Sequence, residues 1–320
     1  MGYNPVVFIN KTVHNDLWIP RRVEVSLEFF GKHRRLSYML PIQDDFLNLR
    51  KIFNDYRCDF VHAHNLWCAY YSYKLGLPTL FDDWEYYLEF LKYVPLISNG
   101  QRARGLPFVW YRRLKAAGYV KELIKNVVVG CTNKYVQEKY VGLDAKHCFV
   151  IPNVPLKFER DYAFAEDVTK QSKLSTCYIG SIKTDKCRLR NTKGVINFWL
   201  KHKELGTLYI FEGVNRVGHL ELLRKLRSFH FNLLFWNPLT VHKYYLQNKA
   251  FLAAALGIPT IITSSLKATI DLLGDFALIV DCLNDIPTVI KYAKFVGLRQ
   301  EHLWECYENN ISKAYKMVCG

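Results

Sequence analysis

The chain lacks the features that mark several common classes of protein. None of its apolar runs approaches the about 18 to 20 residues that a membrane-spanning helix needs. Its first residues have no basic region, long apolar core or small-residue cleavage site of a secretory signal. Nine cysteines are present without a CxxC pair, which argues against a zinc ribbon or a thioredoxin-like site. We therefore expect a cytoplasmic protein with reduced thiols.

Sequence motifs for common cofactors are also missing. There is no Walker A loop, no GxGxxG and no GxSxG. His62 and His64 straddle the carboxyl end of a predicted strand, and we expect them to point to opposite faces. No group of His, Asp and Glu then has clear metal-ligand spacing, so the sequence predicts neither a metal site nor a bound cofactor.

Positive charge and hydrophobic residues are plentiful. Lys and Arg number 44 against 29 Asp and Glu, which gives a formal net charge of +15 and favours anionic partners such as nucleotides, anionic lipid or nucleic acid. Half of the 320 residues are hydrophobic, enough to fill a packed core.

Short β-rich runs alternate with amphipathic stretches along the whole chain, which is typical of βαβ units and parallel sheets. The predicted strands are residues 6–9, 36–39, 60–63, 79–81, 127–129, 149–151, 175–179, 208–211, 233–235, 260–262 and 277–280. The predicted helices are residues 22–30, 65–75, 195–203, 219–228, 243–256 and 300–317.

This rhythm divides the chain into two α/β halves. Residues 156–173 are polar without a clear period and read as a linker or crossover. We predict an N-terminal Rossmann-like domain over 1–155, a second one over 156–299, and a C-terminal helix over 300–320 that packs back on the first domain. Two such domains would face each other across a central cleft at the carboxyl ends of their parallel strands.

Polar residues gather in the segment DFVHAHNLWCAYYSYKLGLPTLFDDWEYY, residues 59–87. His62 and His64 end one predicted strand, and Asp83 and Glu85 follow the next. Because parallel neighbours end at the same edge of a sheet, both groups are expected on the cleft side. Asp82 or Asp83 could instead cap the following helix.

This segment resembles the strand–helix–strand unit of nucleotide-sugar glycosyltransferases with the GT-B fold, family 4 type, although Trp84 stands where that family tends to have His. A second stretch, VVVGCTNKYVQEKYV followed by CFVIPNVP (residues 127–141 and 148–155), is similar to the last unit of the family's first domain, with Thr132 and Asn133 at the start of a helix.

Two further stretches resemble the family's donor-binding domain. CYIGSIK (residues 177–183) is similar to its first strand and glycine turn, and NPLTVHKYYLQNKAFLAAALGIPTIITSS (residues 237–265) to its donor-site helix. The family's Arg and ribose-binding Glu are replaced here by Ser181 and Leu252. The resemblance implies a donor site formed by Gly180, Ser181, Lys183, Arg188, Arg190, Lys193, Glu212, Asn248 and Lys249.

A basic segment rich in aromatic residues spans residues 99–126, NGQRARGLPFVWYRRLKAAGYVKELIKN. Cations interleaved with aromatics suit an anionic membrane surface or a nucleic-acid backbone, and equally an ordinary amphipathic helix. By resemblance, peripheral membrane contact is preferred over nucleic acid.

The resemblance implies a hexosyltransferase that is retaining and independent of metal, with a UDP- or GDP-linked sugar as co-substrate and a glycan, a lipid-linked molecule or a protein as acceptor. Its expected catalytic residues are His64, Asp83 and Glu85, and its expected acceptor-binding residues are Asn10, Lys11 and His62. The alternatives are a degenerate non-catalytic chain of this fold, a basic nucleic-acid-binding protein, or a sugar-nucleotide epimerase.

Overall fold

The computed structural model describes the chain in separate stretches. These are residues 6–10, 34–38, 49–51, 53–55, 57–64, 66–84, 86–89, 106–180, 190–211, 218–293 and 297–320, with the backbone alone in 6–10, 34–38 and 106–113. The described strands form sheets of two, four and five strands, and every pair within them is parallel. The two halves of the chain thus have separate sheets, which confirms the predicted α/β architecture with two Rossmann-like units.

The N-terminal lobe contains the two smaller sheets. Strands β1 (Val6–Asn10) and β2 (Arg34–Tyr38) pair with each other. The four-stranded sheet runs in sequence order. Its elements are β3 (Val61–Ala63), α3 (Leu66–Lys74), β4 (Thr79–Asp83), α5 (Leu106–Asn126), β5 (Val128–Cys131), α6 (Lys134–Val141) and β6 (His147–Val150).

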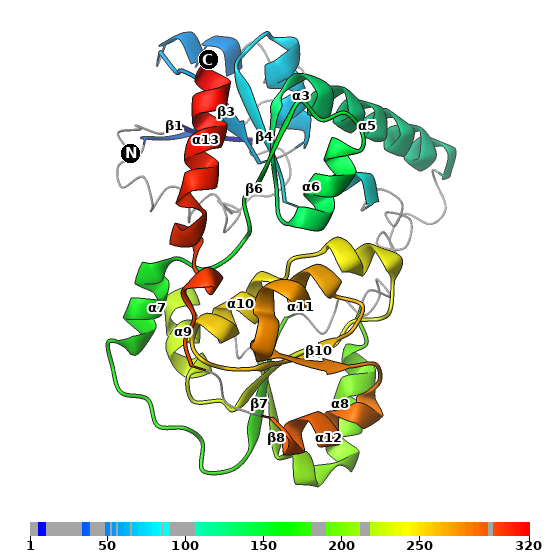
Figure 1. Cartoon of the computed structure of the whole chain (residues 1–320), viewed down its shortest axis with the longest axis vertical. Helices are drawn as coiled ribbons and strands as arrows, with labels where there is room; N and C mark the ends of the chain where they lie inside the picture. Colours follow the sequence, from blue (N-terminus) through cyan, green and yellow to red (C-terminus); the bar gives the residue numbers. More distant parts are fainter. Residues whose placement is uncertain are drawn as a thin grey trace.

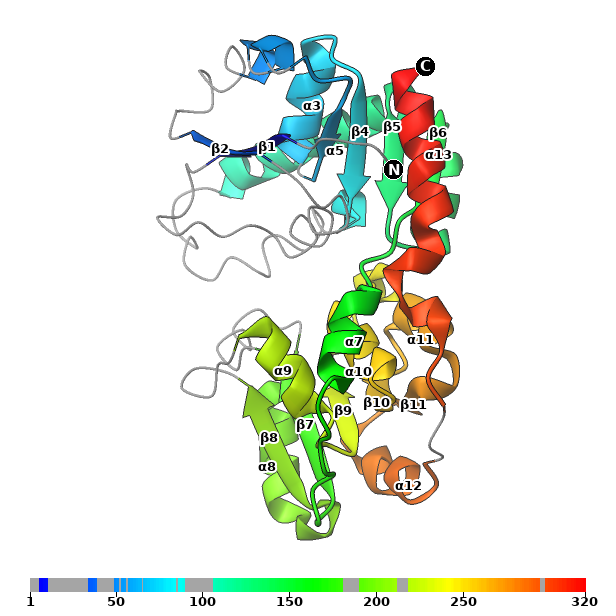
Figure 2. The same cartoon turned by 90° about the vertical axis from the view of Figure 1, so that its left-hand side faces the viewer.

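The two faces of this sheet are covered by different helices, because successive strand residues point to opposite sides. Phe81 and Val129 pack in a core with the buried residues of α3, α5 and α6. Leu80 and Val128 face the other way and share a core with α13 (Glu308–Cys319), the C-terminal helix. Figures 1 and 2 show α13 running from the C-terminal half of the molecule along this sheet.

The C-terminal lobe is built on the five-stranded sheet, in the order β11-β10-β9-β7-β8. Its elements are α7 (Lys157–Phe164), β7 (Ser175–Ile179), α8 (Thr192–Lys201), η2 (Lys203–Leu205), β8 (Thr207–Phe211), α9 (His219–Leu226), β9 (Phe231–Leu234), η4 (Thr240–Tyr244), α10 (Asn248–Ala255), β10 (Thr260–Thr263), α11 (Lys267–Leu273), η5 (Gly274–Phe276), β11 (Ala277–Val280), η6 (Leu283–Asp285), α12 (Ile286–Lys291), η7 (Gln300–His302) and η8 (Trp304–Tyr307).

Alternation along these strands again separates two cores. Leu233 and Ile261 pack with buried residues of α8 and α12. Their chain neighbours Leu234 and Ile262 pack with α10 and α11 in the core that α13 shares. One continuous apolar cluster therefore links the C-terminal lobe to the N-terminal sheet through α13.

The strands of the two lobes point toward each other. In Figure 2 the arrows of β4 and β5 are directed at the C-terminal lobe, and the arrow of β8 is directed at the N-terminal lobe. Contacts between residues of the two lobes also join them. Asn133 Nδ2 donates to the Tyr244 carbonyl over 2.8 Å, the Tyr86 and Tyr244 rings lie 4.7 Å apart, and Lys134 Nζ lies 3.7 Å from Asp271 Oδ2. The carboxyl edges of the two sheets thus face a common space.

The sequence located each of the eleven strands that the structure describes, with ends shifted by a few residues. One linker prediction and two helix predictions differ. Residues 156–173 were expected to be a linker, yet α7 begins at Lys157, where the buried Glu159 accepts a hydrogen bond from the Leu156 amide (2.8 Å). The helix expected over 243–256 begins only at Asn248, and the one expected over 300–317 is divided into η7, η8 and α13. The helix expected over 22–30 lies outside the described residues.

Candidate active site

The C-terminal sheet has a topological switch point next to β7. From β7 the chain moves to β8 on one side and then to β9 on the other. In open α/β sheets, ligands bind beyond the carboxyl ends of the strands at such a point, because the connections diverge there and leave the edge uncovered. Gly180 directly follows β7, and Trp236 lies two residues beyond β9.

Two cationic side chains converge at Gly180. A methyl group added to this glycine would lie 3.2 Å from Arg190 Nη1 and 3.2 Å from Lys249 Nζ. Any other residue at position 180 would crowd both cations. The glycine therefore lets two positively charged groups approach the backbone at this turn, a setting that suits a phosphate or diphosphate group.

The position of Arg190 is fixed by its neighbours rather than by its local sequence. Its backbone forms an isolated antiparallel bridge with Trp236, and its guanidinium lies 4.9 Å from the centre of that indole ring. Asn237 Nδ2 donates to the Arg190 carbonyl over 3.3 Å. Sequence reasoning missed Trp236, although its place just after a strand of the switch point was a signal that it could be part of the site.

A buried histidine supports Trp236 from behind. The His242 ring stands edge-on to the indole at 4.8 Å, and its Nδ1 lies 2.6 Å from the Asn237 carbonyl oxygen. Burial lowers the pKa of His242 to about 4, and the nearby Arg190 acts in the same direction. The imidazole is therefore neutral near pH 7 and adds no charge to the cationic pair.

Asn248 and Lys249, two of the residues that the resemblance assigns to the donor site, open helix α10. The N-cap residue Gln247 makes no side-chain bond to the amide groups of the first turn. The helix ends before Gly257, whose φ of 75° lies in the left-handed region that favours glycine.

Lys193 is an exposed residue in the first turn of α8, and its contact with a phosphate group stays a prediction. The glycine after it has a clear structural reason. Asn191 caps α8 by accepting a bond from the Gly194 amide (3.1 Å), and a methyl group at position 194 would lie 2.4 Å from Asn191 Oδ1.

Leu252, which replaces the family's ribose-binding Glu, is buried. It packs with Leu223, Leu226 and Phe229 in the core under α9. This position of α10 offers no polar atom to a nucleotide, so any ribose contact must come from other residues.

The N-terminal lobe brings His62, His64 and Asp82 together at the carboxyl ends of β3 and β4. Asp82 Oδ2 lies 2.8 Å from His64 Nδ1 and 3.4 Å from His62 Nε2, and the two imidazole rings stack with centres 4.2 Å apart. Asp82 is fully buried, and the histidine side chains are 13% and 14% exposed. Tyr315 of α13 completes the group, with its hydroxyl 2.9 Å from His62 Nδ1.

The expectation that His62 and His64 point to opposite faces was wrong. Residues two apart on a strand share a face, and the strand ends at Ala63, so the bend at His64 turns its ring over that of His62. Asp82 lies on the same face of the sheet as His62. Leu80 pairs with His62, and Phe81, between Leu80 and Asp82, packs in the core on the other face. The three side chains can therefore act on one ligand, contrary to the argument against joint ligation.

Asp83 lies on the other face of β4 and is fully buried. Its carboxylate accepts bonds from the Tyr87 amide (3.1 Å to Oδ2) and from the Tyr140 hydroxyl. Burial and the Asp83 charge raise the pKa of Tyr140, which keeps that hydroxyl protonated as a donor. We assign Asp83 to holding the backbone at residue 87, in line with the capping alternative, and its catalytic role stays a prediction.

Several predicted site residues lie outside the described residues: Lys11, Glu85, Ser181, Lys183, Arg188 and Glu212. Asn10 ends β1, where the structure describes the backbone alone. Of the remaining predictions, Gly180, Arg190 and Lys249 form one group and His62 and His64 another. Tyr315 had no sequence signal, since 253 residues separate it from His62.

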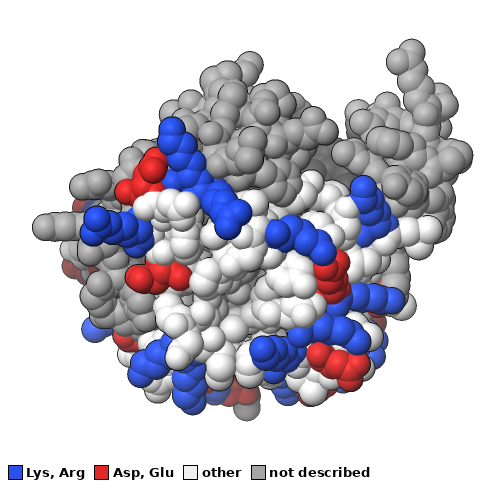
Figure 3. Space-filling model, turned by 90° about the horizontal axis from the view of Figure 1, so that it is seen from above, with Lys and Arg blue, Asp and Glu red and all other residues white. Residues whose placement is uncertain are grey.

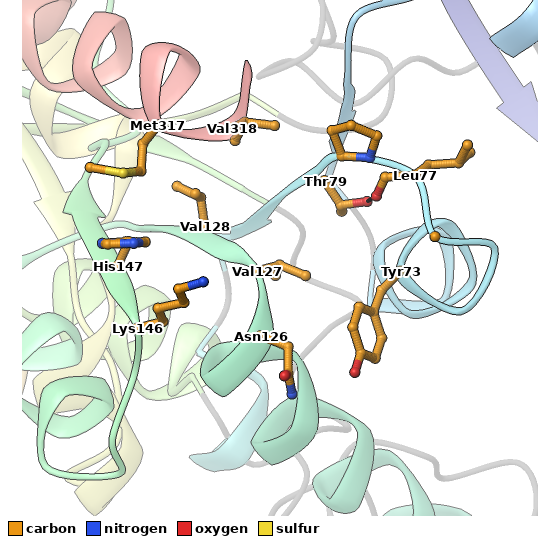
Figure 4. A pocket seen from close by; sticks show the side chains of 12 residues that line it. Tyr73, Leu77, Thr79, Asn126, Val127, Val128, Lys146, His147, Met317 and Val318 are labelled. Atoms are coloured by element: carbon orange, nitrogen blue, oxygen red, sulfur yellow. Dashed lines mark hydrogen bonds between the residues drawn. The ribbon is translucent and has the colours of Figure 1, made fainter. Parts of the chain in front are cut away.

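A groove of about 430 Å³ lies at the opposite edge of the N-terminal sheet. Thr79, Val128 and His147, the first residues of β4, β5 and β6, contribute to its wall together with Met317 of α13 (Figure 4). Because it lies at the amino ends of the strands, it is separate from the histidine cluster.

The described part of the basic segment behaves as an amphipathic helix. Ala116, Val120 and Leu123 of α5 are buried, while Lys121 and Lys125 are exposed. Figure 3 shows that on the face seen from above the described Lys and Arg side chains are spread among Asp and Glu rather than gathered in one patch. Among the described residues, the helices are too short or too polar to cross a bilayer. Membrane contact stays a prediction.

Comparisons with known proteins find structural likeness alone. No family model matches the chain, and no curated protein matches its sequence. The chain is similar to the structure of sucrose-phosphate synthase from Thermosynechococcus elongatus, with 13% identity, a TM-score of 0.58 and coverage of 98% of this chain and 88% of that one.

Two other solved structures are similar over most of their length. For the N-terminal domain of trehalose-6-phosphate phosphatase from Candida albicans, identity is 10%, the TM-score 0.50 and coverage 98% and 85%. For UGT73P12 from Glycyrrhiza uralensis, identity is 11%, the TM-score 0.44 and coverage 94% and 82%.

The fold is thus that of the two-domain GT-B class, with two Rossmann-like lobes joined through a C-terminal helix. At this level of identity the likeness establishes the fold and not the reaction, since one fold serves many functions. The resemblance to family 4 stays a prediction.

Proposed function

We propose that the chain transfers a hexose from a nucleotide-diphosphate sugar to an acceptor hydroxyl. The observation that carries this proposal is the convergence of Arg190 Nη1 and Lys249 Nζ at Gly180, at the switch point of the C-terminal sheet. The donor diphosphate would lie there, against the first turn of α10. The GT-B fold supports the proposal because it provides a second lobe opposite this site for the acceptor.

The chemistry of transfer explains why two cations are useful. When the bond between the sugar C1 and the diphosphate oxygen breaks, its electron pair goes to the diphosphate, which gains negative charge. Arg190 and Lys249 are already in place to stabilise that charge, and preorganised charge is usually the largest contribution to catalysis. The side chains then take the role that a divalent metal has at other diphosphate sites, so transfer would not require a metal at the diphosphate.

The acceptor would lie against the N-terminal lobe, near the edge where His64 and His62 end β3. Its hydroxyl oxygen forms the new bond to C1 on the face that the diphosphate leaves, with retention of configuration. Its proton passes to an oxygen of the departing phosphate, so the balance of atoms and charge needs no protein base. A glycan, a lipid-linked molecule or a protein could supply the hydroxyl.

Calorimetric titration with UDP and GDP tests donor binding directly. The wild-type protein should bind one equivalent of one of these nucleotides. Replacing a charged donor of hydrogen bonds costs about 1.5–3 kcal/mol, so Lys249→Gln and Arg190→Gln should each weaken binding about 10-fold to 100-fold. Lys243→Gln is the matched control, because Lys243 is exposed and precedes α10 by only a few residues.

Incubation with labelled UDP- and GDP-sugars then tests the reaction. A transferase releases sugar to water slowly without its acceptor, and this hydrolysis should fall in Lys249→Gln and persist in Lys243→Gln. Binding without hydrolysis would indicate a degenerate, non-catalytic chain. Absence of binding by either nucleotide would overturn the proposal.

A further inference from the structure

The cluster of His62, His64 and Asp82 has a geometry that an ordinary salt bridge does not require. Each of the three side chains offers one possible ligand atom, and these three atoms all lie within 4.8 Å of one another. They come from β3, the bend after it and β4, which are adjacent parallel strands, so the backbone holds them in register. We propose that these atoms bind one divalent transition-metal ion, of which Zn²⁺ is the best match.

The chemistry of the ligands selects this kind of ion. Two imidazole nitrogens and one carboxylate oxygen are typical Zn²⁺ ligands, whereas Mg²⁺ and Ca²⁺ prefer oxygen alone. Ligand atoms about 2.1 Å from a tetrahedral ion are about 3.4 Å apart. The 3.4 Å between His62 Nε2 and Asp82 Oδ2 matches that separation, and it is longer than most hydrogen bonds. The 2.8 Å between His64 Nδ1 and Asp82 Oδ2 would widen by about 0.6 Å around the ion.

The residues around the cluster hold the three ligands in place. The Tyr315 hydroxyl lies 2.9 Å from His62 Nδ1, the ring nitrogen that does not face Asp82. Such a partner on the second nitrogen orients metal-binding histidines. Trp84 Nε1 donates to the His64 carbonyl over 2.9 Å and so fixes the bend that carries the ring. Both links come from outside β3.

A glycine on the neighbouring strand makes room for Asp82. Gly130 of β5 is paired with Asp82 in the strand register, and a methyl group at position 130 would lie 3.3 Å from Asp82 Oδ1 and 2.9 Å from Ile151 Cδ1. The missing side chain lets the carboxylate approach β5 closely. A bound cation would compensate the charge of this buried carboxylate.

The ion would belong to the N-terminal lobe, apart from the cationic pair that is proposed to bind the donor. Three protein ligands leave a fourth position of a tetrahedral ion open to water or to an oxygen of an acceptor. The expectation that no metal is bound would then apply to the site proposed for the donor diphosphate. It would not apply to the acceptor side. The inference concerns metal binding alone, so its success or failure is independent of the transfer reaction.

Titration of the chelator-treated full chain with Zn²⁺, followed by calorimetry, tests the proposal. We expect one equivalent to bind, with no binding of Mg²⁺ under the same conditions. His64→Ala should weaken Zn²⁺ binding more than about 100-fold, and Tyr315→Phe about 10-fold through the orientation of His62. His147→Ala is the matched control, because His147 is half-buried on β6 at the other edge of the sheet, and it should bind as the wild type does.

A second variant decides the matter if His64→Ala does not fold. His64→Cys should keep a ligand and give a thiolate-to-metal absorption band with Co²⁺, a band that wild type and His147→Cys lack. Zn²⁺ binding of equal strength in wild type and His64→Ala, or no band in a folded His64→Cys protein, would overturn the proposal. So would the absence of Zn²⁺ binding by the wild type, which would leave the cluster a structural role within the N-terminal lobe.

Discussion

The two groups of polar residues at the facing edges of the sheets differ in their burial and in the signs of their charges. In the N-terminal lobe, Asp82 is fully buried and its carboxylate lies beside the imidazole rings of His62 and His64. In the C-terminal lobe, Arg190 and Lys249 are half-buried and two like charges converge at one glycine. The first arrangement brings a buried carboxylate next to two imidazoles, whereas the second brings two cationic groups close together at the sheet edge. The two groups therefore differ in burial, although both lie at the carboxyl ends of their strands. The buried group suits a structural or metal-binding role, and the half-buried group suits a ligand site.

The largest difference between the lobes should appear on removal of the buried carboxylate charge. Asp82→Asn leaves two imidazoles without their common anion, and breaking a buried pair costs about 3–5 kcal/mol in the free energy of unfolding. Asp144→Asn breaks a surface pair with Lys125 (3.1 Å) and should cost less than about 1 kcal/mol. Urea denaturation of both variants measures the contrast. Equal losses would show that Asp82 does not hold its cluster together.

A second test uses the pH dependence of stability to examine His242, which packs against Trp236 next to Arg190. The pKa of His242 is lowered by burial from 6.5 to about 4, so between these values the unfolded chain binds a proton that the folded chain excludes. Stability should therefore fall as pH drops from about 6.5 to about 4, by about 3 kcal/mol in total.

The variant His242→Gln isolates this contribution from other groups. Burial also lowers the pKa of His230 and of His302, so the wild-type profile contains their effects too. Urea denaturation between pH 4 and pH 7 should show a smaller loss of stability in His242→Gln than in wild type. Parallel profiles for the two proteins would contradict the assignment.

A smaller effect is expected where the C-terminal helix reaches the N-terminal cluster. Tyr315→Phe removes the hydroxyl next to His62 Nδ1 and keeps the ring, which lies 4.7 Å from the Phe60 ring. The loss of one hydrogen bond should lower the free energy of unfolding by about 1 kcal/mol. Tyr292→Phe, at a residue that is 69% exposed, should change it little, and thermal denaturation of both variants measures the difference.

The smallest effect on stability should come from the cationic pair itself. In the absence of nucleotide, Lys249→Gln removes one of two neighbouring positive charges, so the free energy of unfolding should change by less than about 0.5 kcal/mol. The same change should weaken nucleotide binding strongly. Thermal denaturation without ligand checks this, and a large loss of stability would show that Lys249 holds the fold rather than the ligand.

Helix α10 shows what a pattern of residues can and cannot predict. Asn248 and Lys249 were expected within one helix and Gly257 at its end, because helix termination and strand entry are decided by neighbouring residues. The start of this helix at Asn248 rather than at residue 243 was missed. The apolar spacing continues through η4, and the backbone leaves the helix at Tyr245 because Thr269 Oγ1 donates to its carbonyl over 2.7 Å.

The sequence by itself determined the alternation of strands and helices, the two α/β halves and the edge on which the polar side chains collect, because these follow from the spacing of apolar and polar residues along the chain. Only the tertiary structure decided which polar residues meet. Trp236 beneath Arg190, Tyr315 beside His62 and Asp82 over Gly130 are contacts between distant segments. Such contacts depend on how strands pair and helices cross, and that packing also decides which charges are buried.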